Sequence, residues 1–437
     1  MIFKEYRKSM LVRGAIGNLA VKAIAVTMAF FIQIVLARML GAENFGIYVY
    51  AFTLVSLLMI LSDMGFSQAS MRFIAVYNGE KEWMLLKGFL QYTNKIVFAT
   101  AVLIALLCAF GVWVIREKLS AEFFYTLLIA IAGLPILSLL QMKEGWLIGF
   151  KRVIRAEIPR TILQPSVFCA GIVIAILWFK IDFTAATAMS ISIIAAVIAL
   201  IVASFLFYKI RPGEVSIVEA SFNSREWFNV ARAMLLIAVL YQLILYRLGI
   251  IMVGVIRGPK EAGFYVVASN IAGLLTLVSA AVNSSFGPAI ADIYAKGNHK
   301  ELQHLVMKAS RLVLFASSLL FAVFLVFGKR ILDFYGGEFY SVYSALAVLL
   351  CAHILIALSG QIGLLFSITG RHNMVVRFLL VGLFLNAALN MAFIPNYGAL
   401  GASMATAFTA LYWYIAMAVN MWKRFEILPF PLRLKVE

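Results

Sequence analysis

The chain has 437 residues, of which 64% are hydrophobic and 13% are charged, and its net charge is +17. A soluble globular protein is about half apolar and about a quarter charged, so this composition predicts a multi-pass membrane protein. The positive charge by itself would also suit a nucleic-acid-binding protein. In a membrane protein, however, it has a topological explanation, because cytoplasmic loops carry an excess of Lys and Arg.

Apolar runs of about 20 residues, the length that crosses a bilayer as a helix, recur along the whole chain. Segments of alternating polarity, which are typical of transmembrane β-barrels, are absent. The sequence therefore predicts an all-α polytopic membrane protein with about twelve transmembrane helices. The expected spans are residues 15–38, 44–66, 88–114, 122–148, 157–179, 184–208, 230–256, 263–290, 306–327, 340–367, 375–394 and 398–421.

The distribution of basic residues predicts the orientation. With twelve spans, the side that carries both termini holds 26 of the 37 Lys and Arg residues, and the other side holds 8. The remaining three are Lys22, Lys95 and Arg247, which lie inside spans. The positive-inside rule then places both termini in the cytoplasm. The count accounts for most of the net charge, so no nucleic-acid partner is expected.

An internal repeat predicts two halves. The stretch "GAENFGIYVYAFTLVSLL" from Gly41 and the stretch "GPKEAGFYVVASNIAGLL" from Gly258 match at an offset of 217 residues, including Tyr48 with Tyr265. The longest loop between spans separates six spans from six. We therefore expect a bundle over residues 1–210, a cytoplasmic linker over 211–229 and a second bundle over 230–437. Because six is even, the two bundles would be parallel pseudo-repeats.

Lys22 belongs to a polar stripe on the first span. Helical periodicity places Asn18, Lys22 and Gln33 on one face together with small residues. Lipid would not accept this face, so we expect it to line a cavity and to contact substrate. The alternative is that the Lys22 side chain reaches the cytoplasmic headgroups. Arg38 ends the same span and is expected at a lip or an interface.

Arg247 lies near the centre of its expected span. At 1.5 Å per residue each end of the span is at least about 15 Å away, which is too far for the side chain to reach a headgroup easily. An arginine at this depth costs about 2.5–3.5 kcal/mol, so a functional position facing a lumen is favoured. The alternative is a structural ion pair with Asp63 or Glu144, the two acids that are candidates for ion pairing or coupling.

Lys95 follows Gln91 and Asn94 on one face of its span. Its side chain could contact substrate or extend to the lipid headgroups, and the sequence favours neither. Asp63 lies near a cytoplasmic span end, where a solvated helix cap is the default interpretation.

The interior cations outnumber the acids that could be interior, so the sequence predicts a cationic lumen for an anionic cargo. Without a P-loop, an HExxH motif or a nucleophile elbow, neither an enzyme, a metal site nor a cofactor is predicted.

Several motifs resemble one known family. They are "LAR-LG--NFG-Y" from Leu36 to Tyr48, "SDMGF" from Ser62, "RFIA" from Arg72 and "ITGRHN" from Ile368. In these motifs the chain resembles the Wzx-type flippases, the O-antigen or polysaccharide biosynthesis proteins of the multidrug/oligosaccharidyl-lipid/polysaccharide exporter superfamily. Chain length, span number and the two halves agree with this resemblance.

The resemblance implies two six-helix lobes in a V shape around a central cavity, and alternating access. It implies an undecaprenyl-diphosphate-linked oligosaccharide as cargo, moved to the outer leaflet, for example in lipopolysaccharide synthesis. Lys22 and Arg247 would then contact the diphosphate or acidic sugars. Besides membrane lipids, an association with glycan polymerase and chain-length proteins is left open. One alternative is a cation-coupled exporter of small amphipathic molecules that depends on Asp63 or Glu144. The other, a membrane-embedded enzyme of glycan assembly, lacks the large outer loop that it would need.

Overall fold

The fold was analysed in a computed structural model, which describes residues 2–177, 183–243, 247–296, 298–369 and 372–425. Throughout these ranges the secondary structure is helical, with no strand. The chain divides into two compact units, Met1–Val239 and Leu240–Glu437. Each unit is described separately below.

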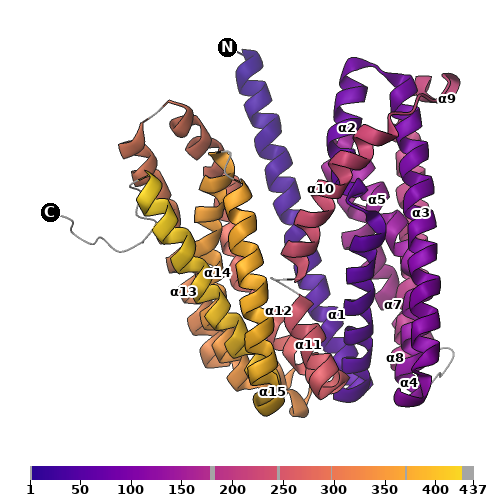
Figure 1. The fold of residues 1–437 in the computed structure, drawn as a ribbon, viewed down its shortest axis with the longest axis vertical. Helices are drawn as coiled ribbons and strands as arrows, with labels where there is room; N and C mark the ends of the chain where they lie inside the picture. The colour runs from indigo at the N-terminus through magenta and orange to yellow at the C-terminus, as the bar shows by residue number, and fades with distance from the viewer. Residues whose placement is uncertain (1, 178–182, 244–246, 297, 370–371, 426–437) are drawn as a thin grey trace. The chain divides into compact units, whose positions relative to one another are not determined.

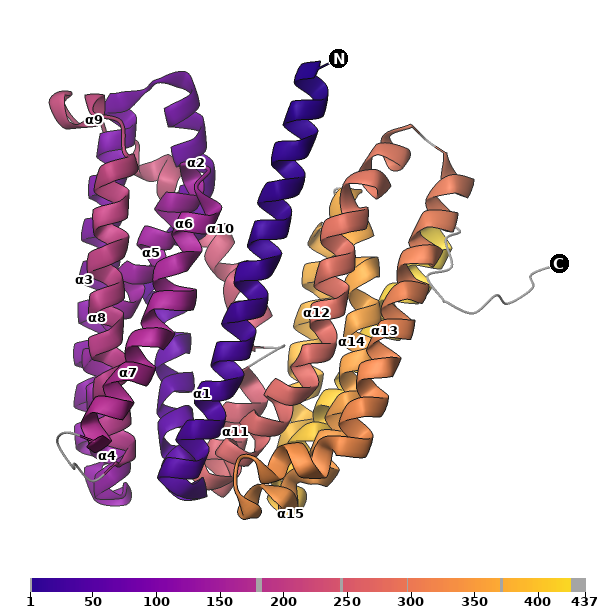
Figure 2. The same cartoon turned by 180° about the vertical axis from the view of Figure 1, so that it is seen from behind.

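The N-terminal unit is a bundle of long helices (Figures 1 and 2). Its longest helices are α1 and α3, the shorter α2 packs on α5 and α3, and a π-helical turn over Pro159–Leu163 joins α6 to α7. Helices α4 and α5 meet at Gly133 with a bend of 42°. The bounds are α1 Ile2–Asp63, α2 Phe66–Glu80, α3 Trp83–Val114, α4 Ala121–Ala132, α5 Leu134–Gly149, α6 Val153–Ile158, α7 Gln164–Leu177, α8 Ala185–Ile210, α9 Glu214–Ile217 and α10 Ser224–Gln242.

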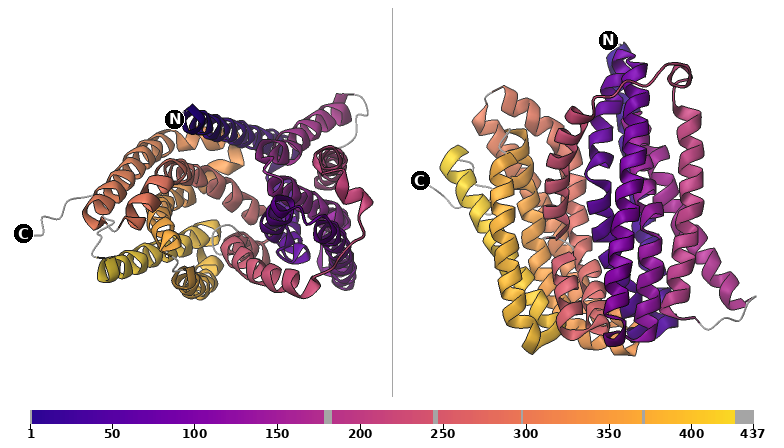
Figure 3. Two further views of the ribbon diagram at one scale, coloured as in Figure 1. Left: turned by 90° about the horizontal axis from the view of Figure 1, so that it is seen from above. Right: turned by 45° about the vertical axis from the view of Figure 1, so that its right-hand side comes forward.

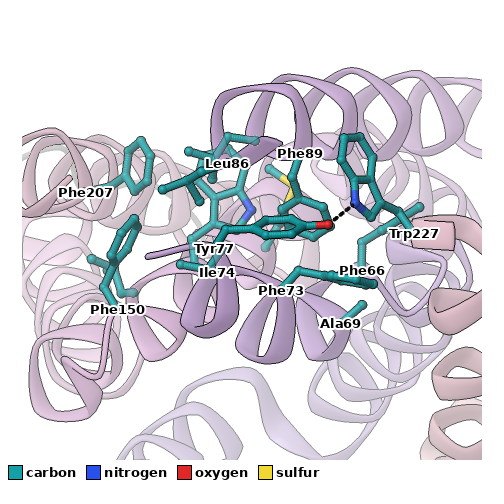
Figure 4. Packing of buried hydrophobic residues seen from close by; sticks show 14 of the residues in the cluster. Phe66, Ala69, Phe73, Ile74, Tyr77, Leu86, Phe89, Phe150, Phe207 and Trp227 are labelled. Atoms are coloured by element: carbon teal, nitrogen blue, oxygen red, sulfur yellow. Dashed lines mark hydrogen bonds between the residues drawn. The ribbon is translucent and has the colours of Figure 1, made fainter. Parts of the chain in front are cut away.

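The core of this unit is a cluster of buried residues rich in aromatic side chains (Figure 4). It gathers side chains from α2, α3, α5 and α8, and Trp227 of α10 is completely buried within it. The Trp227 indole N–H donates a hydrogen bond of 2.9 Å to the Tyr77 hydroxyl. The segment 211–229, expected as a linker, therefore packs into the N-terminal unit. The division between units falls at Val239, inside the span expected over 230–256.

The C-terminal unit packs four long helices, α12 to α15, around a second apolar cluster with α11 at one end. Figure 3 views the helices from above and from a turned side. A 3₁₀ helix over Gly337–Val342 precedes α14. The bounds are α11 Leu248–Arg257, α12 Pro259–Ala295, α13 His299–Asp333, α14 Tyr343–Ile368 and α15 His372–Phe425.

Eight of the described helices, or nine counting the bent α4–α5 pair as one span, are long and apolar enough to cross a membrane. The chain is thus an all-α multi-pass membrane protein, with fewer separate candidate spans than the twelve apolar runs. Part of the difference has a local cause, because two helices each join two expected spans across a break. Helix α1 breaks at Gly41, and α15 breaks at Gly398, shortly after Pro395.

Residues paired by the sequence repeat adopt matching local structure. Gly41 has φ 69° and ψ 172°, and its repeat partner Gly258 has φ 92° and ψ 171°. This left-handed region is open to glycine at little cost, and in both places a helix starts directly afterwards. The Tyr48 hydroxyl interacts with Ser192 of α8, and the Tyr265 hydroxyl lies 3.0 Å from Oγ1 of Thr406 on α15.

Candidate functional site

A basic pocket lies at one end of the N-terminal unit, beside the aromatic cluster. Its volume is about 470 Å³, and it is open on one side rather than enclosed. Its walls come from the first turns of α3, from α5, from the last turn of α8 and from α9 with the residues beside it. The lining residues are Lys87, Leu90, Gln91, Asn94, Lys95, Lys143, Trp146, Phe207, Tyr208, Arg211, Val215 and Ser216.

Helical periodicity explains how α3 contributes to the pocket. Lys87, Gln91, Asn94 and Lys95 follow one another at spacings of three, four or one residues and so lie on one face of the helix. On the other wall, Tyr208 and Arg211 lie three residues apart at the C-terminal end of α8. A cation in that position is favoured by the partial negative charge of the helix end.

The pocket gathers four cations, and its lining, as described, contains no carboxylate. Lys143 is half-buried, and its Nζ lies 3.8 Å from the centre of the Trp146 ring and 5.0 Å from that of Phe207. The Arg211 guanidinium lies 4.7 Å from the centre of the Tyr208 ring. Cation–π contacts of this kind contribute about 0.5–2 kcal/mol. They stabilise each cation separately and leave the net positive charge of the pocket uncompensated.

Lys87 holds one wall of the pocket in place. Its Nζ donates to the backbone carbonyls of Ser216, at 3.1 Å, and Val218, at 2.6 Å. The Ser221 backbone N–H donates to the carbonyl of Met84, at 3.0 Å. These bonds attach α9 and the residues after it to the start of α3. Lys87 is therefore a structural cation, and Lys95, Lys143 and Arg211 remain available to a ligand.

Among the residues predicted from sequence, Lys95 lies in this pocket, where it and Gln91 are exposed and Asn94 is half-buried. Asn18 and Lys22 lie on α1, but their side chains are outside the described part of the structure. Gln33 is half-buried and Arg38 is exposed, both on the same helix. None of these four α1 residues is among the lining residues of the pocket.

Arg247 lies directly before α11, within its expected span. Helix α10 ends at Gln242, and α11 begins at Leu248 with Arg247 as its N-cap residue. The Arg247 side chain is half-buried. The described residues that follow α10 and precede α11, Leu243 and Arg247, are π-helical.

The two candidate acids, Asp63 and Glu144, lie in the N-terminal unit and have partners there. The Asp63 carboxylate is only 2% exposed and accepts hydrogen bonds from the Ser67 backbone N–H, at 3.1 Å, and from its hydroxyl, at 2.7 Å. It thus acts near the start of α2, as expected of a cap, but it is buried and not solvated. Glu144 pairs with Arg160 at 3.2 Å.

Sequence reasoning missed Lys143 and Arg211 as site residues, because both were assigned to the basic residues of the cytoplasmic loops. Lys143 in fact lies within α5, inside the apolar run "LPILSLLQMKEGWLIG". The signal for it was present: a lysine within an apolar helix, with a tryptophan three residues later on the same face. Arg211 could be assigned to the pocket only from the packing of α8 against α5.

The described helices define a class of protein, a multi-pass membrane protein built from two helical units. Residues 11–294 match the family of polysaccharide biosynthesis proteins. This match covers more than half of the chain, and the chain therefore belongs to that family. An uncharacterized membrane protein of Methanocaldococcus jannaschii is 22% identical over 418 residues, which cover 92% of this chain and 82% of that protein.

Solved structures show that the fold is MATE-like. An inward-facing MATE-family multidrug resistance transporter of the MOP superfamily has a TM-score of 0.78 at 15% identity, covering 95% of this chain and 98% of that one. The lipid II flippase MurJ has a TM-score of 0.68 at 14% identity, covering 92% and 87%. A MOP-superfamily transporter from Pyrococcus furiosus, described as having a binding pocket of reversed polarity, has 0.62 at 14%, covering 95% and 97%. These likenesses show the fold, and the family match shows that the chain is a polysaccharide biosynthesis protein.

Proposed function

We propose that this protein is a flippase that moves an undecaprenyl-diphosphate-linked oligosaccharide from the cytoplasmic to the outer leaflet. The observation that carries the proposal is the family match over residues 11–294, which places the chain in polysaccharide biosynthesis. The transporter fold, which it shares with a lipid II flippase, supports movement of a lipid-linked substrate. We place the protein in the cell membrane with both termini in the cytoplasm, with no nucleic-acid partner.

The proposed architecture has twelve spans in two parallel bundles of six. The breaks at Gly41 and Gly398 support this count, because each divides one long helix into two of the expected spans. The shared backbone conformation of Gly41 and Gly258 supports the repeat. The interactions of Tyr48 with α8 and of Tyr265 with α15 add to it, since each ties the second span of a half to the sixth.

We propose alternating access through a cationic lumen as the mechanism. The polar head of the substrate pays a large penalty in hydrocarbon, whereas its isoprenoid tail pays none and can remain in the bilayer. Cations inside the membrane would offset the head's negative charge during the crossing. Lys22 and Arg247 are the proposed contacts for diphosphate or acidic sugars, with Asn18, Gln33, Arg38 and Lys95 as further polar contacts.

The test is a comparison of transport in cells that depend on this protein for a lipid-linked surface glycan. We expect Lys22→Ala and Arg247→Ala to reduce surface glycan at least about tenfold, since each removes a charge-assisted contact, and lipid-linked oligosaccharide to accumulate inside. The matched control is Arg257→Ala, an exposed arginine in the last turn of α11. Normal surface glycan in both lumen variants, at wild-type protein levels, would contradict the proposal.

A cation-coupled exporter of small amphipathic molecules is the alternative function, and the buried Asp63 carboxylate favours it. A coupled exporter needs an acid that can bind and release a cation, so Asp63→Asn would abolish its transport while Arg247→Ala would be tolerated. The same set of cells distinguishes the two functions. The flippase proposal expects the reverse pattern.

A further inference from the structure

We infer that the basic pocket of the N-terminal unit binds the phosphate headgroup of an anionic membrane lipid. This inference does not depend on the proposed transport function. The pocket is built from residues of one unit only, on α3, α5, α8 and α9.

The positive charges of the pocket favour the binding of an anion. Lys143 and Arg211 lie close enough for their positive charges to repel each other. Among the described residues, the salt bridges that form elsewhere in this unit leave Lys95, Lys143 and Arg211 without a carboxylate partner. Several like charges beside a region of low dielectric raise the free energy of the empty pocket. A phosphate, with several acceptor oxygens, can bind two or three of these donors at once.

The surface beside the pocket is apolar and suits contact with acyl chains. On α3, the face that carries Gln91, Asn94 and Lys95 continues one turn later to Phe98, which is 49% exposed. On α8, the face of Tyr208 continues to Ile201, which is 62% exposed. Both helices are candidate membrane spans, so we expect these apolar side chains to contact lipid tails. The site therefore joins a phosphate-binding pocket to a surface for hydrocarbon.

The position of the pocket along the helices agrees with a headgroup. It lies at the first turns of α3 and the last turn of α8, at one end of two candidate spans. Its rings, Trp146 and Tyr208, belong to the residue types that are enriched at the membrane–water interface. Basic pockets between transmembrane helices recur as sites for acidic lipid headgroups. A free phosphate would bind the cations but would make no contact with the adjoining apolar surface.

The experiment measures lipid binding by native mass spectrometry of the purified full-length protein. Phosphatidylglycerol and phosphatidylcholine of equal chain length are titrated separately. The pocket variant is Lys95→Gln with Arg211→Gln. The matched control is Arg116→Gln with Lys118→Gln, two basic residues at the other end of α3, where Arg116 lies 5.2 Å from the centre of the Trp113 ring. The charge-retaining pair Lys95→Arg with Arg211→Lys tests whether the substitutions themselves disturb folding.

We expect wild type and the control variant to bind one phosphatidylglycerol at least about tenfold more tightly than phosphatidylcholine. Both headgroups carry a phosphate, but the choline ammonium leaves phosphatidylcholine without net charge and is repelled by the pocket cations. The pocket variant should lose this preference, and the charge-retaining pair should keep it. Equal loss in the pocket and control variants would overturn the inference. Inorganic pyrophosphate supplies the free anion. If it displaces phosphatidylglycerol completely at equal concentration, the site serves a soluble anion and the lipid assignment fails.

Discussion

At the scale of single residues, the polar groups of the N-terminal unit serve two purposes. Asp63 and Glu144 have hydrogen-bonding or ionic partners within the unit, and such buried polar groups hold helices in register. Lys95, Lys143 and Arg211 instead share a pocket whose described lining offers them no carboxylate. Paired groups are expected to matter for folding, and the pocket cations are expected to matter for binding.

The Tyr77–Trp227 contact gives the first stability prediction. Burial raises the pKa of Tyr77 from its ordinary value of 10.0, so its hydroxyl stays neutral and accepts from the indole N–H. Tyr77→Phe keeps the ring but leaves the buried Trp227 N–H without its partner, which costs about 1–3 kcal/mol. A lower midpoint of thermal unfolding in detergent would show this.

The control for that prediction is Tyr125→Phe, because this tyrosine is 58% exposed on α4 and its hydroxyl is accessible. Removing an exposed hydroxyl changes stability by about 0.5 kcal/mol or less. If Tyr77→Phe unfolds at the same temperature as Tyr125→Phe, the hydrogen bond does not stabilise the attachment of α10.

At the scale of elements, the close packing of α2 on α5 depends on small residues. Gly145 and Gly149 form a GxxxG pattern on α5, and such patterns let two helix backbones approach closely in a membrane. A Cβ on Gly145 would lie 2.4 Å from the backbone oxygen of Ser67, and one on Gly149 would lie 2.9 Å from that of Ser70. A backbone atom cannot turn away as a side chain can.

Gly145→Ala is therefore expected to force α2 and α5 apart and to destabilise the protein by about 1–3 kcal/mol. Gly111→Ala on α3 is the matched control, because its Cβ would meet no atom within 4 Å. Alanine has the higher helix propensity, so this variant should be neutral or stabilised by up to about 1 kcal/mol. Thermal unfolding of both variants in one detergent decides the matter, and an equal shift in both would argue against the packing explanation.

The helices and their packing show which features could be predicted from the sequence and which could not. Apolar runs predicted where helices lie, because hydropathy is a local property of the chain. The repeat predicted that Gly41 and Gly258 are equivalent, and the two residues share a backbone conformation. The burial of Asp63 and the pocket around Lys143 depend on packing between segments far apart in sequence. Periodicity carries no information on such contacts.

At the scale of the whole molecule, the helix breaks and the distribution of basic residues together predict on which side of the membrane each loop lies. If Gly41 separates two spans, the chain turns at that point, and the residues after Glu80 return to the side of the N-terminus. If the halves are parallel repeats, the residue equivalent to Glu43 at the offset of 217, which is Lys260, must lie on the same side as Glu43. The basic residues then predict that side to be the outside.

Cysteine accessibility tests this topology in intact cells. In a background without the three free cysteines Cys108, Cys169 and Cys351, single cysteines are placed at the exposed positions Glu43, Glu82, Lys260 and Lys300. We expect Glu43→Cys and Lys260→Cys to react with an impermeant maleimide from outside, and Glu82→Cys and Lys300→Cys to react only after permeabilisation. Reaction of Glu43→Cys and Glu82→Cys from the same side would mean that no span lies between Gly41 and Asp63. Opposite sides for Glu43→Cys and Lys260→Cys would make the repeats inverted, and the parallel architecture proposed here would be wrong.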